Sequence, residues 1–122
     1  MISVISEMPI TDESYPFSSA ERYCHLSANG YVEREYRVDG TANVYCTADE
    51  DGGVEVMTAD APYSNRIVVR APKDPAQASG NVVVEIINPT SFMEIERMWI
   101  LGYGEFVRSG DIYVGITSKP NT

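Results

Sequence analysis

The sequence predicts an α/β domain in which an antiparallel, strand-rich first half precedes one strand–helix–strand crossover. Short apolar stretches separated by Gly, Pro and Asp fill residues 31–71, as expected for antiparallel strands. The run NVVVEIIN at 81–88 is almost entirely apolar, which is typical of a strand buried on both faces of a parallel sheet. Large apolar residues then recur at spacings of three and four over 92–107, which predicts one amphipathic helix.

The antiparallel half is expected to contain four short strands. Asp39-Gly40 is a hairpin turn signal, Gly52-Gly53 marks the tip of a second hairpin, and Asp60-Ala61-Pro62 should break the chain again. Residues 1–28 are polar and carry two prolines, so we expect an extended arm with at most a short helical turn. The remainder, 29–122, is expected to form a single partial domain. The expected strands are 31–38, 42–46, 54–58 and 65–71.

The second half predicts a β-α-β crossover with one clear helix. The strand at 81–88 is followed by a helix over roughly 93–108, which Ser109-Gly110 should end, and by a strand at 111–117. Strands joined in this way lie parallel in one sheet. The two strands and the helix should therefore pack as one unit.

The charge distribution excludes several classes of partner. The chain carries 18 Asp and Glu against 9 Lys and Arg, a net charge of −9, and residues 1–60 account for this excess. An acidic surface repels phosphate backbones, so no nucleic-acid partner is expected. No segment has the ~18 apolar residues of a membrane span, and the N-terminus lacks a basic region. A cytoplasmic location is expected, unless a signal peptide was removed before this chain begins.

No catalytic or metal-binding constellation is complete in this sequence. His25 is the only histidine, and a surface or capping role suits it better than catalysis. The run Asp49-Glu50-Asp51 lacks EF-hand spacing and is best interpreted as a solvated acidic loop. Cys24 and Cys46 are expected to be free thiols, with a disulfide as the alternative. We therefore predict no catalytic residue, no metal and no cofactor.

One local feature suggests chemistry, namely the polar loop that follows the 81–88 strand. Ligands of open α/β sheets bind beyond the carboxyl ends of parallel strands, and backbone N–H groups there can bind a developing oxyanion. The candidates for this loop are Asn88, Thr90, Ser91 and Phe92. Pro89 has no N–H, which leaves Thr90, Ser91 and Phe92 as donors. Alternatively, Asn88 only caps the strand and Pro89-Thr90 only begins the helix.

Four segments together resemble the N-terminal part of the α/β-hydrolase domain family, in a bacterial group. They are GYVEREYRVDGTANVYC, PYSNRIVVRAPKDP, GNVVVEIINPTSFMEIERMW and GYGEFVRSGDIYVGITSK, and they span roughly residues 29–119. The resemblance identifies 81–88 as the family's third strand, 88–97 as its oxyanion loop, roughly 98–109 as its first helix and 111–117 as its fourth strand. The family's loop commonly contains Ser-Gly where this chain has Pro-Thr-Ser.

The resemblance implies an ester- or acyl-hydrolysing serine enzyme that acts on a small molecule. The family's nucleophile, acid and histidine follow the fourth strand, so no residue here matches them. We therefore expect an N-terminal fragment or subunit that is inactive alone. Its expected partner is a second polypeptide carrying the rest of the hydrolase domain, or further copies of itself. The alternative is a non-enzymatic α+β binding module that oligomerises.

Overall fold

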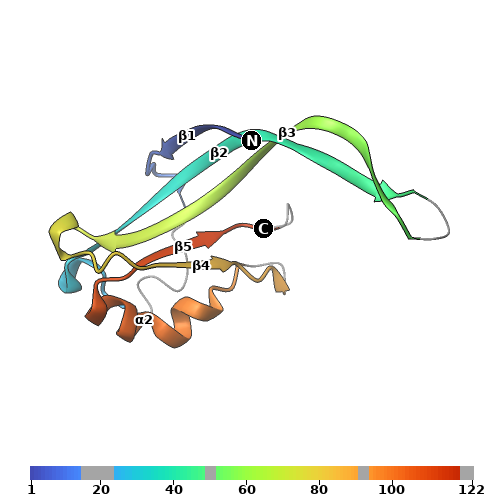
Figure 1. Ribbon diagram of the computed structural model, residues 1–122. Helices are drawn as coiled ribbons and strands as arrows, with labels where there is room; N and C mark the ends of the chain where they lie inside the picture. The colour runs from blue at the N-terminus through green and yellow to red at the C-terminus, as the bar shows by residue number, and fades with distance from the viewer. Residues whose placement is uncertain (15–23, 49–51, 91–93, 119–122) are drawn as a thin grey trace.

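The computed structural model describes residues 1–14, 24–48, 52–90 and 94–118. These parts of the chain form one five-stranded sheet, one α-helix and two short 3₁₀ helices (Figure 1). The elements are β1 (Ile2–Met8), η1 (Ser27–Asn29), β2 (Tyr31–Thr47), β3 (Val54–Pro72), η2 (Pro75–Gln77), β4 (Val82–Ile86), α2 (Arg97–Ser109) and β5 (Ile112–Ile116).

The sheet has the strand order β1-β2-β3-β5-β4. The pairs β1–β2, β2–β3 and β3–β5 are antiparallel, whereas β4 and β5 are parallel. The predicted strand–helix–strand unit with two parallel strands is therefore confirmed. Residues 2–8, expected to be an extended arm, form a strand that pairs with β2, so this segment belongs to the sheet.

The turn predicted at Asp39-Gly40 is wrong, because β2 runs without a break from Tyr31 to Thr47. Gly40 is required by packing and not by a turn. A Cβ atom built on it would lie 2.4 Å from the carbonyl oxygen of Met1 and 2.8 Å from the hydroxyl of Tyr63. The glycine therefore lets β1 and a tyrosine of β3 approach the middle of β2 closely.

The break predicted at Asp60-Ala61-Pro62 is also wrong, because β3 continues through it. The segment Asp60-Ala61-Pro62 instead lies at a β-bulge. Asp60 has a φ of 52°, and its N–H donates to Oδ1 of Asn43 at 3.2 Å, where the β2–β3 register shifts. Bulges of this kind add twist to a ribbon without ending it, so four expected strands become two long ones.

Helix α2 begins at Arg97, four residues later than the helical periodicity predicts. The delay arises because Ile95 is extended and exchanges backbone hydrogen bonds with Asn88, 3.2 and 2.9 Å long. The predicted end is confirmed. Gly110 has a φ of 79° and its N–H donates to the carbonyl of Phe106. No helix in the described parts of the chain is long and apolar enough to cross a bilayer.

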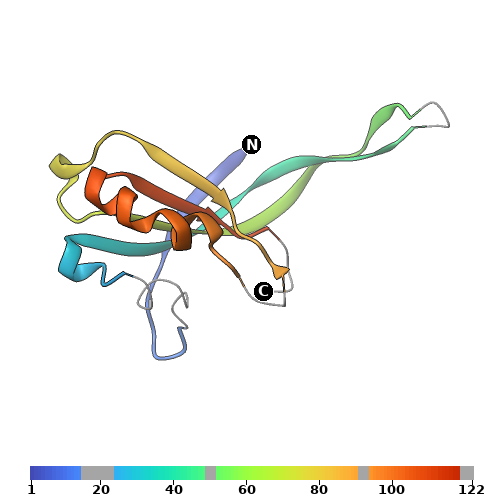
Figure 2. The ribbon, with the colours of Figure 1, turned by 90° about the horizontal axis from the view of Figure 1, so that it is seen from below.

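The hydrophobic core lies between α2 and one face of the sheet (Figures 1 and 2). Its buried members are Cys24, Leu26, Tyr31, Val68, Ile87, Trp99 and Tyr113. Trp99 is its centre, because its ring lies 5.2 Å from that of Tyr113 and 6.3 Å from those of Tyr103 and Phe106. Both cysteines are free thiols, as expected, although only Cys24 is buried.

At β4 the opposite face of the sheet is apolar but exposed, so the prediction that 81–88 is buried on both faces is wrong. Val82, Val84 and Ile86 of β4 are 55%, 59% and 72% exposed. Among the described residues, β4 is also the last strand of the sheet and has one unpaired edge. The neighbouring outward-facing residues on β5 and β3 are Ile112, Val114, Ile116, Ile67 and Val69. We call these eight residues the bare face.

Replacing Trp99 by alanine should remove the centre of the core. We expect Trp99→Ala to lower the free energy of unfolding by about 3–5 kcal/mol, since a fully buried indole leaves a large cavity. Leu101→Ala is the matched control, because Leu101 is 84% exposed on the same helix. Its effect should stay within about 0.5 kcal/mol. Denaturant titration followed by circular dichroism measures both, and equal losses would contradict this view of the core.

Candidate functional site

The loop that joins β4 to α2 leaves the carboxyl end of a parallel strand. Its base is closed by the paired backbones of Asn88 and Ile95. Within the loop, Oδ1 of Asn88 accepts hydrogen bonds from the N–H and the hydroxyl of Thr90, the first of them 2.9 Å long. This side-chain turn fixes the backbone around Pro89.

These contacts show where the predicted oxyanion residues lie. Asn88 and Thr90 come together at the start of the loop, and their amides already donate to Ile95 and Asn88. Ser91 and Phe92 lie outside the described residues. The assignment of an oxyanion site to this loop remains a prediction.

The far end of the loop is held by Glu94. Its carboxylate accepts a hydrogen bond from Nη2 of Arg66 on β3 and another, 2.5 Å long, from the hydroxyl of Thr117. The Arg66 Nε also lies 3.8 Å from the carboxylate of Glu35. Glu94 therefore connects the loop to β3 and to the residue just after β5.

Glu96 makes a second and deeper attachment, to a fully buried Arg70. Nη1 of Arg70 lies 2.7 Å from Oε1 of Glu96, and Nη2 donates to Oε2 at 3.2 Å. The Nε of Arg70 donates to Glu33 on β2 at 2.7 Å. Only one of the two Glu96 contacts has hydrogen-bond geometry.

Two aromatic rings enclose the same guanidinium group. The Cζ of Arg70 lies 4.4 Å from the ring centroid of Trp99 and 5.4 Å from that of Tyr113. Cation–π contacts at such distances stabilise a desolvated guanidinium. A planar guanidinium can bind carboxylates along its edges while rings cover its faces, which lysine cannot do.

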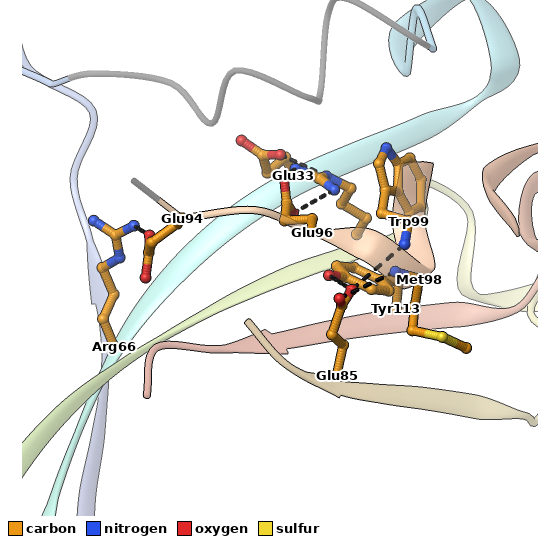
Figure 3. Close-up of polar contacts among 9 residues, drawn as sticks. Glu33, Arg66, Glu85, Glu94, Glu96, Met98, Trp99 and Tyr113 are labelled. Carbon is orange, nitrogen blue, oxygen red and sulfur yellow. Dashed lines mark hydrogen bonds and ion pairs between the residues drawn. The ribbon is translucent and has the colours of Figure 1, made fainter. Parts of the chain in front are cut away.

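Glu85 ties the beginning of α2 to β4. Its carboxylate accepts hydrogen bonds from the backbone N–H groups of Met98 at 3.0 Å and Trp99 at 3.4 Å (Figure 3). It also accepts a 2.6 Å hydrogen bond from the hydroxyl of Tyr113. Glu85 thus satisfies N–H groups that a helix start leaves unpaired, and its charge complements the helix dipole.

The excess of carboxylates over cations affects protonation at this site. Burial raises the pKa of Glu96 to about 7; the Arg70 charge opposes the shift, and Glu33 and Glu85 add to it. Burial and the hydrogen bond to Glu85 raise the pKa of Tyr113 well above that of a free tyrosine. Tyr113 therefore acts as a hydrogen-bond donor, and Glu96 changes charge near neutral pH.

A cavity of about 700 Å³ lies beside the Arg66 anchor. Its walls come from residues 7–14 and from strands β2 and β3, and they include Glu33, Glu35 and Arg66. Burial raises the pKa of Glu35, although the nearby Arg66 partly offsets that effect. The volume suits a small molecule, and the shared Arg66 places the cavity near the end of the loop.

The sequence reasoning missed Arg70, Glu85 and Tyr113 as determinants of this site. A signal was present, because Glu85 and Arg70 are charged residues within strands that otherwise predict burial. Glu94 and Glu96 lie directly before α2, and they bind two different arginines. The Asp49–Asp51 run lies outside the described residues, and the rest contains no group of three metal-binding side chains.

The raised pKa of Glu96 predicts a specific pH dependence of stability. Folded Glu96 holds a proton that the unfolded chain releases, so this stabilisation is complete below the ordinary glutamate pKa and is lost as pH rises through about 7. Between about pH 5 and pH 8, the wild type should lose on the order of 3 kcal/mol relative to Glu96→Gln.

The matched control for this experiment is Glu105→Gln. Hydrogen bonds from Arg108 and then Ser109 lower the pKa of the exposed Glu105, so it is fully ionised throughout this pH range. Its unfolding free energy should therefore parallel that of the wild type above pH 5. Urea titrations at several pH values measure all three proteins. Parallel profiles for the wild type and Glu96→Gln would contradict the assignment.

Comparison with known protein families agrees with this architecture. The family model described as an alpha/beta hydrolase domain matches residues 4–122. No curated protein and no solved structure matches significantly. The family match covers nearly the whole chain, and the mixed sheet with its parallel β4–β5 pair fits part of that fold. The chain belongs to the α/β-hydrolase domain family.

Proposed function

We propose that this chain supplies the oxyanion loop of a serine-type acyl hydrolase, and that the nucleophile lies on polypeptide other than residues 1–122. The observation that carries the proposal is the β4–α2 loop. It leaves the carboxyl end of a parallel strand and is anchored at Asn88, Glu94 and Glu96. An oxyanion donor stabilises a transition state only when its position is fixed before the reaction. The ionic and backbone contacts of Asn88, Glu94 and Glu96, at the described ends of the loop, support the proposal.

The donors we propose are the amides of Ser91 and Phe92. The Asn88 and Thr90 amides are engaged within the loop, and Pro89 has none. In α/β-hydrolases one oxyanion N–H comes from this loop and the other follows the nucleophile. The nucleophile must then lie next to the loop, so the strand that leads to it should pair with the free edge of β4.

The bare face supports the proposal that further polypeptide covers this side of the sheet. Parallel strands are normally covered on both faces, yet Val84 and Ile86 are more than half exposed. An aliphatic surface across three strands is a typical docking face for amphipathic helices. We propose that a second polypeptide carrying the rest of the hydrolase domain adds a strand at β4 and helices over this face.

The proposed substrate is a small ester or other acyl compound. Support comes from the cavity of about 700 Å³ next to the Arg66 anchor, since this volume is in the range of small-molecule sites. The chain alone should therefore be catalytically silent, because it has the loop but not the attacking group.

The function is tested by complementation with the downstream part of a hydrolase from the same family. We expect no hydrolysis of short-chain nitrophenyl esters by either chain alone and hydrolysis by the mixture. Phe92→Pro and Ser91→Pro each remove one amide donor. The variant that loses the true donor should reduce kcat by roughly 10²–10³-fold, with a smaller change in KM.

Two controls separate catalysis from assembly. Leu101→Ala alters an exposed residue of α2 and should leave kcat unchanged. Val84→Lys places a charge on the bare face and should prevent assembly itself, as measured by light scattering. Full activity in both proline variants would reject the loop as the source of an oxyanion donor. Ester hydrolysis by this chain alone would reject the proposal that it lacks the nucleophile.

A further inference from the structure

The cavity beside the Arg66 anchor has an acidic wall. It lies between the end of β1, the segment that follows β1, and strands β2 and β3, and its volume is about 700 Å³. Four glutamates and two arginines contribute to the described wall, so its carboxylates exceed its guanidinium groups by two. The glutamates are Glu7, Glu13, Glu33 and Glu35. The charge of the wall therefore favours a cationic ligand.

Both arginines of the wall already have carboxylate partners. The Nε of Arg34 lies 3.9 Å from the carboxylate of Glu7. Arg66 binds Glu94 through Nη2 (Figure 3), and its Nε lies 3.8 Å from the carboxylate of Glu35. An anionic ligand would have to displace one of these carboxylates within a cavity whose net charge repels it. An anion is therefore a poor ligand for this cavity.

Glu35 is the wall residue that gains most from an added cation. Its side chain is only 23% exposed, and its partner Arg66 is shared with Glu94. Burial raises the pKa of Glu35; the Arg66 charge opposes the shift, and the charges of Glu33 and Glu94 add to it. A further positive charge beside Glu35 would offset both its desolvation and this repulsion.

The shape of the cavity favours an organic cation over a metal ion. A metal ion needs several ligands that converge on one point, and among the described residues no three His, Cys, Asp or Glu side chains could hold one. Met8, Pro9 and Ile10 add apolar surface to the wall, and the volume suits a small molecule.

The wall also distinguishes between classes of organic cation. Quaternary ammonium groups are typically bound against aromatic rings, and the described residues of this wall include none. Carboxylates instead accept charge-assisted hydrogen bonds from N–H donors. The class that fits is a protonated amine with an apolar body.

We propose that this cavity binds a protonated amine whose ammonium group donates to the carboxylate of Glu35 and whose apolar body lies against Met8 and Pro9. Glu13 and Glu33 strengthen the negative potential around the ammonium group. The inference deepens the proposed function and rests on it for one consequence, namely that the hydrolysed acyl compound carries an amine. Binding of the amine itself is a property of this chain and is measured without a second polypeptide.

Calorimetric titration of the full chain with hexylamine, hexanol and hexanoate tests the proposal. The three probes share one alkyl chain and differ in charge, and at about pH 7.5 the amine is protonated. We expect saturable binding of hexylamine, with a dissociation constant at least about tenfold below that of hexanol, because a charge-assisted hydrogen bond is lost in the alcohol. Hexanoate should not bind.

Glu35→Gln removes the proposed ion partner at nearly constant size. It should weaken the binding of hexylamine by about tenfold or more and leave that of hexanol within about twofold. The matched control is Glu105→Gln, which removes an exposed carboxylate on α2 and should change neither affinity. If circular dichroism shows that Glu35→Gln does not fold, Glu13→Gln alters an exposed residue of the same wall and should weaken hexylamine by about threefold.

Amide chemical shifts locate the bound probe. Hexylamine should shift the amides of residues 7–10 and 33–35, and shifts confined to the bare face would overturn the proposal. Equal affinities for hexylamine and hexanol would also overturn it, as would unchanged binding in Glu35→Gln or, if that variant does not fold, in Glu13→Gln. Failure of hexylamine to bind rejects the amine site and leaves the oxyanion loop, which ester hydrolysis tests, unaffected.

Discussion

The interaction on which the rest of this structure depends is the buried cluster around the Arg70 guanidinium. It joins β2 through Glu33 and the start of α2 through Glu96, while Trp99 and Tyr113 cover its faces. A buried charge costs several kcal/mol unless it is paired and hydrogen-bonded. This cost makes the arrangement specific, because moving the helix or the loop would leave Arg70 unpaired in the core.

The same cluster holds the end of the β4–α2 loop and the start of α2 against the sheet. Glu85 and Glu96 come from opposite sides of the helix start, one from β4 and one from the loop itself. Glu94 adds contacts to Arg66 on β3 and to Thr117 just after β5. The end of the loop and the start of α2 are therefore attached to the sheet by carboxylates.

The sheet has two exposed apolar regions, the bare face and the outer part of the β2–β3 hairpin, and they differ in chemistry. The bare face is broad and aliphatic, which supports the proposal that the remainder of a hydrolase domain covers it. The outer part of the hairpin is narrow, and residues 42–61 carry five acidic residues and no Lys or Arg.

The sequence by itself determined the class of fold, the strand–helix–strand unit and the end of α2 at Gly110, because these follow from local periodicity and from the left-handed backbone that glycine accepts. Only the tertiary structure decided that Gly40 serves close packing and not a turn, and that Ile95 pairs with Asn88 and so delays the helix. It alone also brought Arg70, Glu85 and Glu96 together. Each of these outcomes depends on contacts between residues distant in sequence, whose energies outweigh the local preferences of turn and helix signals.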